Sequence, residues 1–356
     1  MAINKLKNFL KNEHEAILIC SEVNRRYFTG FPSSDGYLLV TKNDAVFFAD
    51  SRYIEAAQNT VKGCRAVLLT RVSTEIKEYV RKNGILKIYT ERNRISVSTA
   101  DFLKTAFLPC RVTFSKKLEE LITSSREIKE AEEIECIKKA QSIAEAAFNH
   151  VLTFIKPGVT EKQIALELDF YMLSHGAEAV SFETIAVTGA KSSMPHGVPD
   201  ETIVKEGDFI TMDFGAVYKG YHSDMTRTVA VGNVSDKQKK IYDIVLKAQE
   251  NALSVLKSGL ACAEADKAAR GIIEDAGYGD YFGHGTGHGV GVEIHEEPSL
   301  SPRSKQTLKE GDVVTVEPGI YLPSEFGVRI EDMALITKAA TSPRLRATLP
   351  PIWCVT

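Results

Sequence analysis

The sequence predicts two domains, an α/β domain followed by a larger α+β domain with antiparallel strands. The length of 356 residues leaves room for two or three domains of about 100–200 residues each. Up to about residue 114, short apolar runs alternate with helical patterns, which is typical of an α/β domain. Beyond a charged segment, amphipathic helices are followed by apolar strands arranged as hairpins. We place the first domain at residues 1–122 and the second at residues 123–337.

The first domain is expected to build its sheet from short apolar runs. These predicted strands are residues 16–20, 37–40, 45–49 and 87–89. A turn at Lys42-Asn43-Asp44 joins the second run to the third. Residues 52–61 and 73–83 predict helices, and Gly84 stops the second of them.

The second domain opens with helices that carry capping-box spacing, in which a Ser or Thr precedes a Glu or Gln by three positions. The pairs are Ser124 with Glu127, Thr160 with Gln163, and Ser235 with Gln238. Behind the first pair, apolar residues recur every three or four positions up to Val151, which predicts an amphipathic helix. The other two helices are expected to end near Gly176 and Gly259.

Composition argues against several classes of protein. Forty-four Lys and Arg stand against 47 Asp and Glu, for a net charge of -3. Nucleic-acid and membrane-surface proteins normally carry a basic excess, so neither partner is expected. No stretch approaches the roughly 18 apolar residues of a membrane helix, and the start lacks the apolar core of a secretory signal. The six cysteines form no C-x-x-C pair, so free thiols in a reducing cytoplasm are expected.

Two pairs of acidic residues interrupt the apolar strands of the second domain. A two-residue turn at Tyr218 and Lys219 would place Asp213 directly opposite Asp224, where like charges are destabilising. A second hairpin, with its loop centred near Ser324, would place Glu317 opposite Glu331. A lone acid of this kind would be interpreted as solvent-facing, but four are costly to bury unpaired. A positive group is therefore expected among them.

The histidines favour a metal as that positive group. Five of the eight lie between positions 196 and 295, and His284, His288 and His295 fall in one glycine-rich run. Imidazole together with carboxylate oxygens suits Mn, Co, Fe or Zn. Four carboxylates also balance two divalent ions, which favours a two-metal site. The sequence contains no P-loop, G-x-G-x-x-G, H-E-x-x-H or G-x-S-x-G motif, so the usual nucleotide, zincin and serine-hydrolase signatures are excluded.

This constellation resembles the ligand set of the pita-bread metallopeptidases, in the Xaa-Pro branch of aminopeptidase P and Xaa-Pro dipeptidase (prolidase). The five matching positions are Asp213, Asp224, His288 in His284-Gly285-Thr286-Gly287-His288-Gly289, Glu317 in Glu317-Pro318-Gly319, and Glu331 in Arg329-Ile330-Glu331-Asp332. Met194-Pro195-His196-Gly197 is similar to the histidine loop of that branch, and residues 27–31 and 50–53 resemble its N-terminal domain. The resemblance implies a creatinase-like α/β domain followed by an α+β pita-bread domain with a curved antiparallel sheet.

The resemblance also implies roles for individual residues. Asp224 and Glu331 would bridge two metal ions, Asp213 would bind one ion, and His288 and Glu317 would bind the other. Catalytic roles are implied for His196, His295 and Glu317, with Glu317 as proton shuttle. Substrate-binding roles are implied for His284, on the proline side of the pocket, and for Arg329, which would also hold a carboxylate in place. Mn²⁺ is the expected ion, with Co²⁺ and Zn²⁺ as alternatives.

The expected function is metal-dependent hydrolysis of the N-terminal Xaa-Pro bond, and the expected partners are peptides with proline in the second position and a second copy of the chain. Aminopeptidase P is preferred, and a prolidase restricted to dipeptides is the main alternative. A metal-free creatinase-like amidinohydrolase and a non-catalytic binding protein are further alternatives, which the five intact ligand positions oppose. Residues 338–356 depart from the family pattern and are a candidate for disorder.

Overall fold

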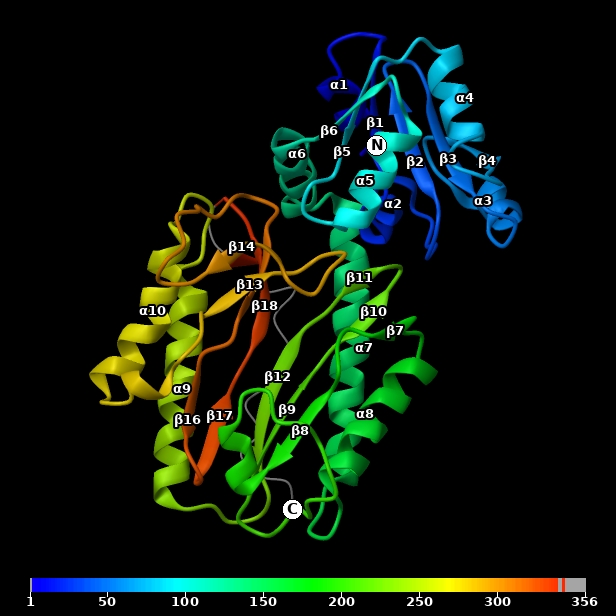
Figure 1. Ribbon diagram of the computed structural model, residues 1–356. Helices are drawn as coiled ribbons and strands as arrows, with labels where there is room; N and C mark the ends of the chain where they lie inside the picture. The colour runs from blue at the N-terminus through cyan, green and yellow to red at the C-terminus, as the bar shows by residue number, and fades with distance from the viewer. Residues whose placement is uncertain (1, 339–340, 343–356) are drawn as a thin grey trace. The chain divides into compact units, whose positions relative to one another are not determined.

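The computed structural model describes residues 2–338 and 341–342. It divides the chain into two compact units, Met1–Arg126 and Glu127–Thr356 (Figure 1). The expected boundary between residues 122 and 123 falls inside helix α6 (Lys116–Glu127). Most of the atypical C-terminal segment lies outside the described residues, but Thr341–Ser342 forms strand β19. Within the described ranges, no helix has both the length and the apolarity needed to cross a bilayer.

The N-terminal unit contains a mixed six-stranded sheet of order β4-β3-β2-β1-β5-β6. Its strands are β1 (Glu15–Ile19), β2 (Tyr37–Thr41), β3 (Ala45–Ala49), β4 (Arg65–Leu68), β5 (Lys87–Thr90) and β6 (Arg111–Phe114). Its helices are α1 (Ile3–Phe9), α2 (Glu22–Thr29), α3 (Ile54–Thr60), α4 (Glu75–Lys82), α5 (Val97–Ala106) and α6. Every residue of β1 and β3 is buried, because the sheet has a core on each face, and this explains their continuous apolar runs. The predicted strands and helices of this unit are confirmed.

The first half of the second unit packs two helices against antiparallel strands (Figure 1). The helices are α7 (Ala131–Phe154) and α8 (Glu161–Ser174). One sheet has the order β12-β9-β8 and consists of β8 (Ile185–Thr188), β9 (Phe209–Phe214) and β12 (Met225–Ala230). The other has the order β11-β10-β7 and consists of β7 (Ala179–Val180), β10 (Ala216–Tyr218) and β11 (Tyr221–His222). The ring of Phe148 on α7 stacks on that of Phe214 on β9. A 3₁₀ turn, η1 (Gly189–Ser193), follows β8.

The second half repeats this plan with another helix pair and another set of strands. The helices are α9 (Asp236–Val255) and α10 (Cys262–Asp275), and a 3₁₀ turn, η2 (Gly279–Tyr281), follows them. A five-stranded sheet of order β14-β13-β15-β18-β19 contains β13 (Gly287–Gly289), β14 (Glu296–Leu300), β15 (Val313–Val316), β18 (Asp332–Ile336) and β19; β16 (Gly319–Leu322) pairs with β17 (Phe326–Arg329). The two helix pairs lie on either side of the strands (Figure 1), each over its own core.

Two of the three predicted helix starts are confirmed. Thr160 and Ser235 each cap a helix through a capping box with the Gln three positions later. The pair Ser124 and Glu127 was wrong as a helix start, because both residues lie in α6. Helix α7 begins at Ala131 instead, where the Glu133 carboxylate accepts a hydrogen bond from the Glu130 amide at 2.7 Å.

The predicted register of the first acidic hairpin was also wrong. Tyr218 pairs with Tyr221, so the turn residues are Lys219 and Gly220, and Asp213 faces Thr226 rather than Asp224. Both turn residues have positive φ, 49° and 80°, the combination that a tight type I′ hairpin turn requires. The predicted turn would have forced Tyr218, which has a bulky side chain, into this conformation.

The predicted register of the second acidic pair is confirmed. Strands β15 and β18 pair Val316 with Asp332, and β16 and β17 pair Gly319 with Arg329, so Glu317 and Glu331 occupy matching positions between these two pairs. Ser324 lies in the loop with a φ of 62°. The predicted loop centre at Ser324 is correct, and the centre of a hairpin loop determines which residues of its two strands pair.

Phe214 tests the packing that supports strand β9. Its side chain is fully buried, and replacing it with Ala should lower the free energy of unfolding by about 3–5 kcal/mol because a cavity remains. Phe170, which is 70% exposed, provides a matched control, since Phe170→Ala should change stability by about 0.5 kcal/mol or less. Urea unfolding of the metal-free variants, followed by circular dichroism, measures both. Equal losses would contradict the assigned core.

Candidate metal centre

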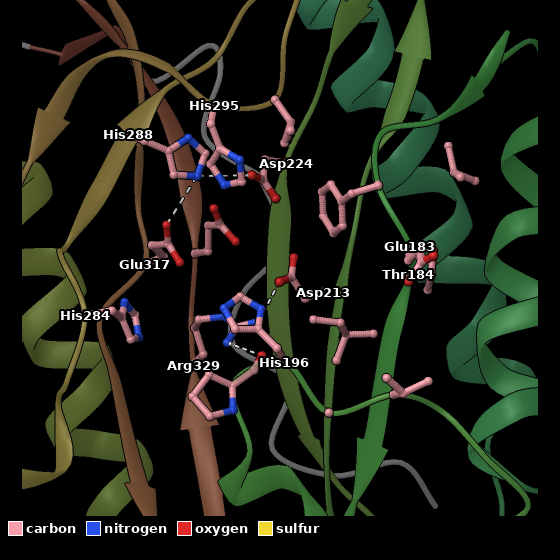
Figure 2. Close-up of a pocket in the computed structure, with 18 of the residues that line it drawn as sticks. Glu183, Thr184, His196, Asp213, Asp224, His284, His288, His295, Glu317 and Arg329 are labelled. Atoms are coloured by element: carbon pink, nitrogen blue, oxygen red, sulfur yellow. Dashed lines mark hydrogen bonds and ion pairs between the residues drawn. The ribbon is translucent and has the colours of Figure 1, made fainter.

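A cavity of about 900 Å³ lies in the second unit, between strands of its two halves (Figure 2). All nine residues that the sequence predicted for the site line it: His196, Asp213, Asp224, His284, His288, His295, Glu317, Arg329 and Glu331. These residues span 136 positions of the sequence, from 196 to 331. The fold therefore brings the whole predicted set to one place.

The five predicted ligands come from strands or from the short breaks between them. Asp213 is on β9 and His288 is on β13, whereas the other three occupy breaks: Asp224 between β11 and β12, Glu317 between β15 and β16, and Glu331 between β17 and β18. Ligand atoms of Asp224, His288 and Glu331 all lie within 4.8 Å of one another. The Nε2 atom of His288 is 3.6 Å from Asp224 Oδ2 and 3.4 Å from Glu317 Oε1. These spacings place one imidazole and its neighbouring carboxylates around a common point.

The hydrogen bonding of His288 orients it as a ligand. Its Nδ1 atom is 3.1 Å from the carbonyl oxygen of Gly289, which can only accept, so the proton is on Nδ1 and the Nε2 lone pair faces the carboxylates. Burial lowers the pKa of His288 to about 4. The imidazole is therefore neutral near pH 7, the form that binds metal ions.

The carboxylates are held together against their mutual repulsion. Burial, reinforced by neighbouring negative charges, raises the pKa of Asp224 and of Glu331 well above their usual values, and burial raises the pKa of Glu317 to about 7. Among the described residues, the buried Oδ1 atom of Asp213 has no hydrogen-bond partner. Divalent cations would neutralise this charge and give that oxygen a partner, and carboxylate oxygens with one imidazole are ligands that such ions accept. The residues present therefore fit a divalent metal centre.

Arg329 connects Asp213, one of the predicted ligands, to the framework around it. Its Nη2 atom donates to Asp213 Oδ2 at 2.5 Å and its Nε atom donates to Thr226 Oγ1 at 3.0 Å. Thr226 in turn donates to Glu331 Oε2 at 2.7 Å. The guanidinium is almost fully buried, and the negative charge of Asp213 is among the causes that raise its pKa. Arg329 thus places a permanent positive charge beside the acidic cluster and fixes the orientation of Asp213.

Two threonines that the sequence analysis missed orient further predicted ligands. Thr315 accepts a hydrogen bond from the His288 amide at 3.1 Å and donates to Glu317 Oε1 at 3.3 Å. Thr226 contacts Glu331 as described above. Each threonine is two positions from a predicted ligand, Thr226 from Asp224 and Thr315 from Glu317, and alternate strand residues face the same side. That period of two was the available signal.

Tyr321, which the sequence analysis also did not predict as a site residue, links Arg329 to His284. Arg329 Nη1 donates to the Tyr321 hydroxyl at 3.1 Å, and that hydroxyl is 2.8 Å from His284 Nε2. The other ring nitrogen of His284 is 2.8 Å from the carbonyl oxygen of Gly285. Burial lowers the pKa of His284 to about 4, so the ring is neutral, donates from Nδ1 and accepts at Nε2. Since both nitrogens are engaged within the protein, His284 can offer the cavity ring carbons rather than a free polar atom.

His196 and His295 are the accessible histidines of the site, and both are exposed. The His295 ring lies 4.3 Å from the His288 ring, whereas His196 follows Pro195, whose carbonyl accepts from Arg329 Nη1 at 3.1 Å. Figure 2 shows His295 beside His288 and Asp224, and His196 beside Arg329 and Asp213. His222, which also falls between positions 196 and 295, lies outside the cavity lining, and its amide donates to the Gly291 carbonyl.

Comparison with known families identifies this arrangement. Residues 135–338 match metallopeptidase family M24, and residues 3–128 match the creatinase/prolidase N-terminal domain. The chain belongs to metallopeptidase family M24. The resemblance stated from the sequence is confirmed, as is the fold class of a creatinase-type domain followed by a pita-bread domain. Enzymes of this family use divalent metal ions, in agreement with the ligand set described above.

Individual relatives of this metallopeptidase are similar over nearly their whole length. An Xaa-Pro dipeptidase of Pyrococcus furiosus is 39% identical over 94% of this chain and 95% of its own. An Xaa-Pro dipeptidase structure from Bacillus anthracis has a TM-score of 0.93 and 41% identity, covering 99% of both chains. An X-Pro aminopeptidase structure from Thermotoga maritima has a TM-score of 0.92 and 35% identity, covering 99% of this chain and 100% of its own.

Two glycines of the His288 run provide a matched test of the metal centre. A Cβ atom at Gly287 would lie 2.0 Å from the backbone oxygen of Thr315, whereas one at Gly283 would meet no atom within 4 Å. Gly287→Ala should therefore displace His288 and Thr315 and weaken metal binding by about 10- to 100-fold, the range seen when the support of a ligand is lost. Gly283→Ala should bind as the parent does. Calorimetric titration of the metal-free proteins with Mn²⁺ measures the difference, and equal affinities would contradict the assigned close approach.

Proposed function

We propose that this metallopeptidase hydrolyses the N-terminal Xaa-Pro peptide bond with a pair of divalent metal ions. The observation that carries the proposal is the convergence of four carboxylates and one neutral imidazole in a single cavity that exposes two further histidines. Similarity to proteins named Xaa-Pro dipeptidase and X-Pro aminopeptidase supports the substrate class. A cytoplasmic location and a homodimer stay predictions.

Charge supports two ions rather than one. Four carboxylates meet in the cavity, and two divalent cations would balance their charge. We assign Asp224 and Glu331 as bridging ligands, Asp213 to one ion, and His288 with Glu317 to the other. Hard carboxylate oxygens with a single imidazole suit Mn²⁺, our first choice, and also Co²⁺ or Zn²⁺.

The chain's own groups would bind the peptide and move its protons. When bound, the metal ions would supply an activated water and would polarise the scissile carbonyl. His196 and His295 are accessible to the cavity and would donate hydrogen bonds to the carbonyl oxygen as negative charge develops on it. Glu317, oriented by Thr315, would deliver a proton to the departing prolyl nitrogen.

The proline ring has a suitable neighbour in His284. Proline lacks an amide hydrogen and has a fixed φ, so a site for Xaa-Pro needs shape rather than a hydrogen-bond acceptor at that nitrogen. His284 uses both ring nitrogens within the protein and would contact the pyrrolidine ring through carbon atoms. We propose that Arg329 acts on the proline side of the cavity by holding Asp213 and the Pro195 carbonyl in place.

Aminopeptidase activity on longer peptides is preferred over a restriction to dipeptides. The cavity of about 900 Å³ is near the upper end of the usual range of about 300–1,000 Å³ for small-ligand sites. This volume supports the proposal that the site accommodates peptide residues beyond the proline. The dipeptidase alternative is retained because relatives of comparable similarity carry both names.

A substrate panel tests the activity and its length preference. The metal-stripped protein should be inactive, and added Mn²⁺ should restore cleavage of both Xaa-Pro dipeptides and Xaa-Pro-Pro tripeptides, since the ions activate the attacking water. Liquid chromatography of the products after restoration with Mn²⁺, Co²⁺ or Zn²⁺ measures this. Cleavage of dipeptides with intact tripeptides would establish the alternative, and no cleavage with any ion would refute the proposal.

The number of metal ions is tested at the proposed bridge. Glu331→Gln should reduce bound Mn²⁺ from two ions per chain to one or none, and should lower kcat/KM by more than about 100-fold, because a direct ligand matters more than its support. Glu325→Gln is the control, since Glu325 pairs with Lys237 at the surface. Elemental analysis after dialysis gives the count. A parent protein with a single ion would contradict the two-metal assignment.

A further inference from the structure

The loop that carries His196 has little apolar burial to hold it. We define the His196 loop as residues 189–200. Met194 is 57% exposed and Val198 is 71% exposed, and His196 between them is exposed as well. Among the described residues, no hydrogen bond to the His196 ring is found. The position of this imidazole is therefore set by the backbone, and the backbone must be held by polar contacts.

One buried carboxylate joins the two ends of this loop. Glu161, the first residue of α8, is 0% exposed. On the entry side of the loop, it accepts hydrogen bonds from the Thr188 amide at 2.7 Å and from Lys191 Nζ at 2.6 Å. On the exit side, it accepts from the Asp200 amide at 3.2 Å. Lys191 Nζ also lies 2.7 Å from the Asp200 carboxylate, which closes the base of the loop a second time.

The backbone secures the exit side independently of this side chain. The Glu161 amide donates to the Thr202 carbonyl and the Lys162 amide donates to the Asp200 carbonyl, both at 3.0 Å. The tip of the loop is held from the opposite half, where Arg329 donates to the Pro195 carbonyl at 3.1 Å. The Glu161 side chain therefore links the fixed exit segment to the entry side, while Arg329 joins the tip to Asp213, a proposed metal ligand.

The burial of Glu161 is costly and needs a reason. Carboxylates near the start of a helix are normally stabilised at its solvent-facing end, and a fully buried carboxylate persists only when it is paired and hydrogen-bonded. Burial raises the pKa of Glu161, which the hydrogen bonds from Lys191, Thr188 and Asp200 oppose. Each of these three donors belongs to the His196 loop or to the residue directly before it.

We propose that Glu161, together with Lys191, is a positioning residue that fixes where the His196 imidazole stands over the metal centre. It touches neither substrate nor metal ligand and acts through His196. The inference rests on the proposed function, in which His196 contacts the substrate, and it assigns a new role to a buried ion pair outside the cavity's predicted set. Loss of the pair should loosen the entry side of the loop and misplace the imidazole.

A double-mutant cycle tests whether the pair acts through His196. Glu161→Gln and Lys191→Met are introduced together, because removing Lys191 alone would leave a buried charge unpaired. In the Mn²⁺ enzyme, this double variant should lower kcat/KM for an Xaa-Pro-Pro peptide by about 10- to 100-fold, a range typical of small misplacements of a reacting group. Combined with His196→Ala, it should change the rate less than about twofold further. Effects that multiply instead would overturn the proposal.

A second ion pair provides the matched control. Lys309 Nζ contacts both oxygens of the buried Glu127 carboxylate at 2.8 Å, away from the His196 loop. Glu127→Gln with Lys309→Met removes an ion pair whose carboxylate is likewise buried, and the resulting protein should keep its kcat/KM within about twofold. An equal loss of activity in this control would show that the Glu161 effect is general destabilisation.

Two further measurements keep the test independent of folding and of the assigned activity. Asp200→Asn removes the surface partner of Lys191 while Glu161 stays in place, so it should give a smaller loss in the same direction that vanishes in the His196→Ala background. Hydrogen exchange should be faster in residues 189–197 of the Glu161→Gln/Lys191→Met protein than in the control pair. If exchange in residues 189–197 is unchanged, the positioning role of Glu161 and Lys191 is refuted whatever the activity. If the parent enzyme is inactive but loop exchange is faster in the double variant, only the proposed function is refuted.

Discussion

The mutual repulsion of four carboxylates in one cavity is the constraint on which the rest of this structure depends. Such a cluster destabilises a fold unless cations or fixed donors compensate it. Arg329 and Thr226 provide some of that compensation, and Thr315 adds a hydrogen bond to Glu317. The backbone provides the rest, because the predicted ligands lie on strands or in the short breaks between strands, where the pairing of neighbouring strands fixes their position. The fold thus holds the carboxylates close together although they repel one another, and divalent ions would neutralise their charge.

The residues that line the cavity were predicted better than the strand register that positions them. The reason is chemical. Aspartate, glutamate and histidine on apolar strands are conspicuous, because each breaks a pattern that burial would otherwise impose. Their clustering indicated a metal site, and the resemblance to a known family then named the nine residues that line the cavity. The register of the first hairpin was missed because the pattern of apolar residues does not show that Lys219 takes a left-handed conformation.

The supporting residues escaped for a different reason. Thr226, Thr315 and Tyr321 are ordinary strand residues, and Glu161 resembles any acid at the start of a helix. Their importance comes from partners far along the chain, such as Glu331 for Thr226 and Lys191 for Glu161. Sequence periodicity describes local faces, whereas these contacts are created by the way separate strands and helices meet. The correct helix starts at Thr160 and Ser235 show the converse, since a capping box is complete within four residues.

Strand β13 is confined on both sides. A Cβ atom at Gly287 would collide with the Thr315 carbonyl, and one at Gly289 would lie 2.3 Å from the Glu297 carbonyl. The strand can therefore present a single side chain, that of residue 288, between two neighbours that must remain bare. The proposed coordination by residue 288 therefore does not depend on packing along the strand, and another donor at this position would change the affinity and selectivity for the metal while the backbone around it stayed the same.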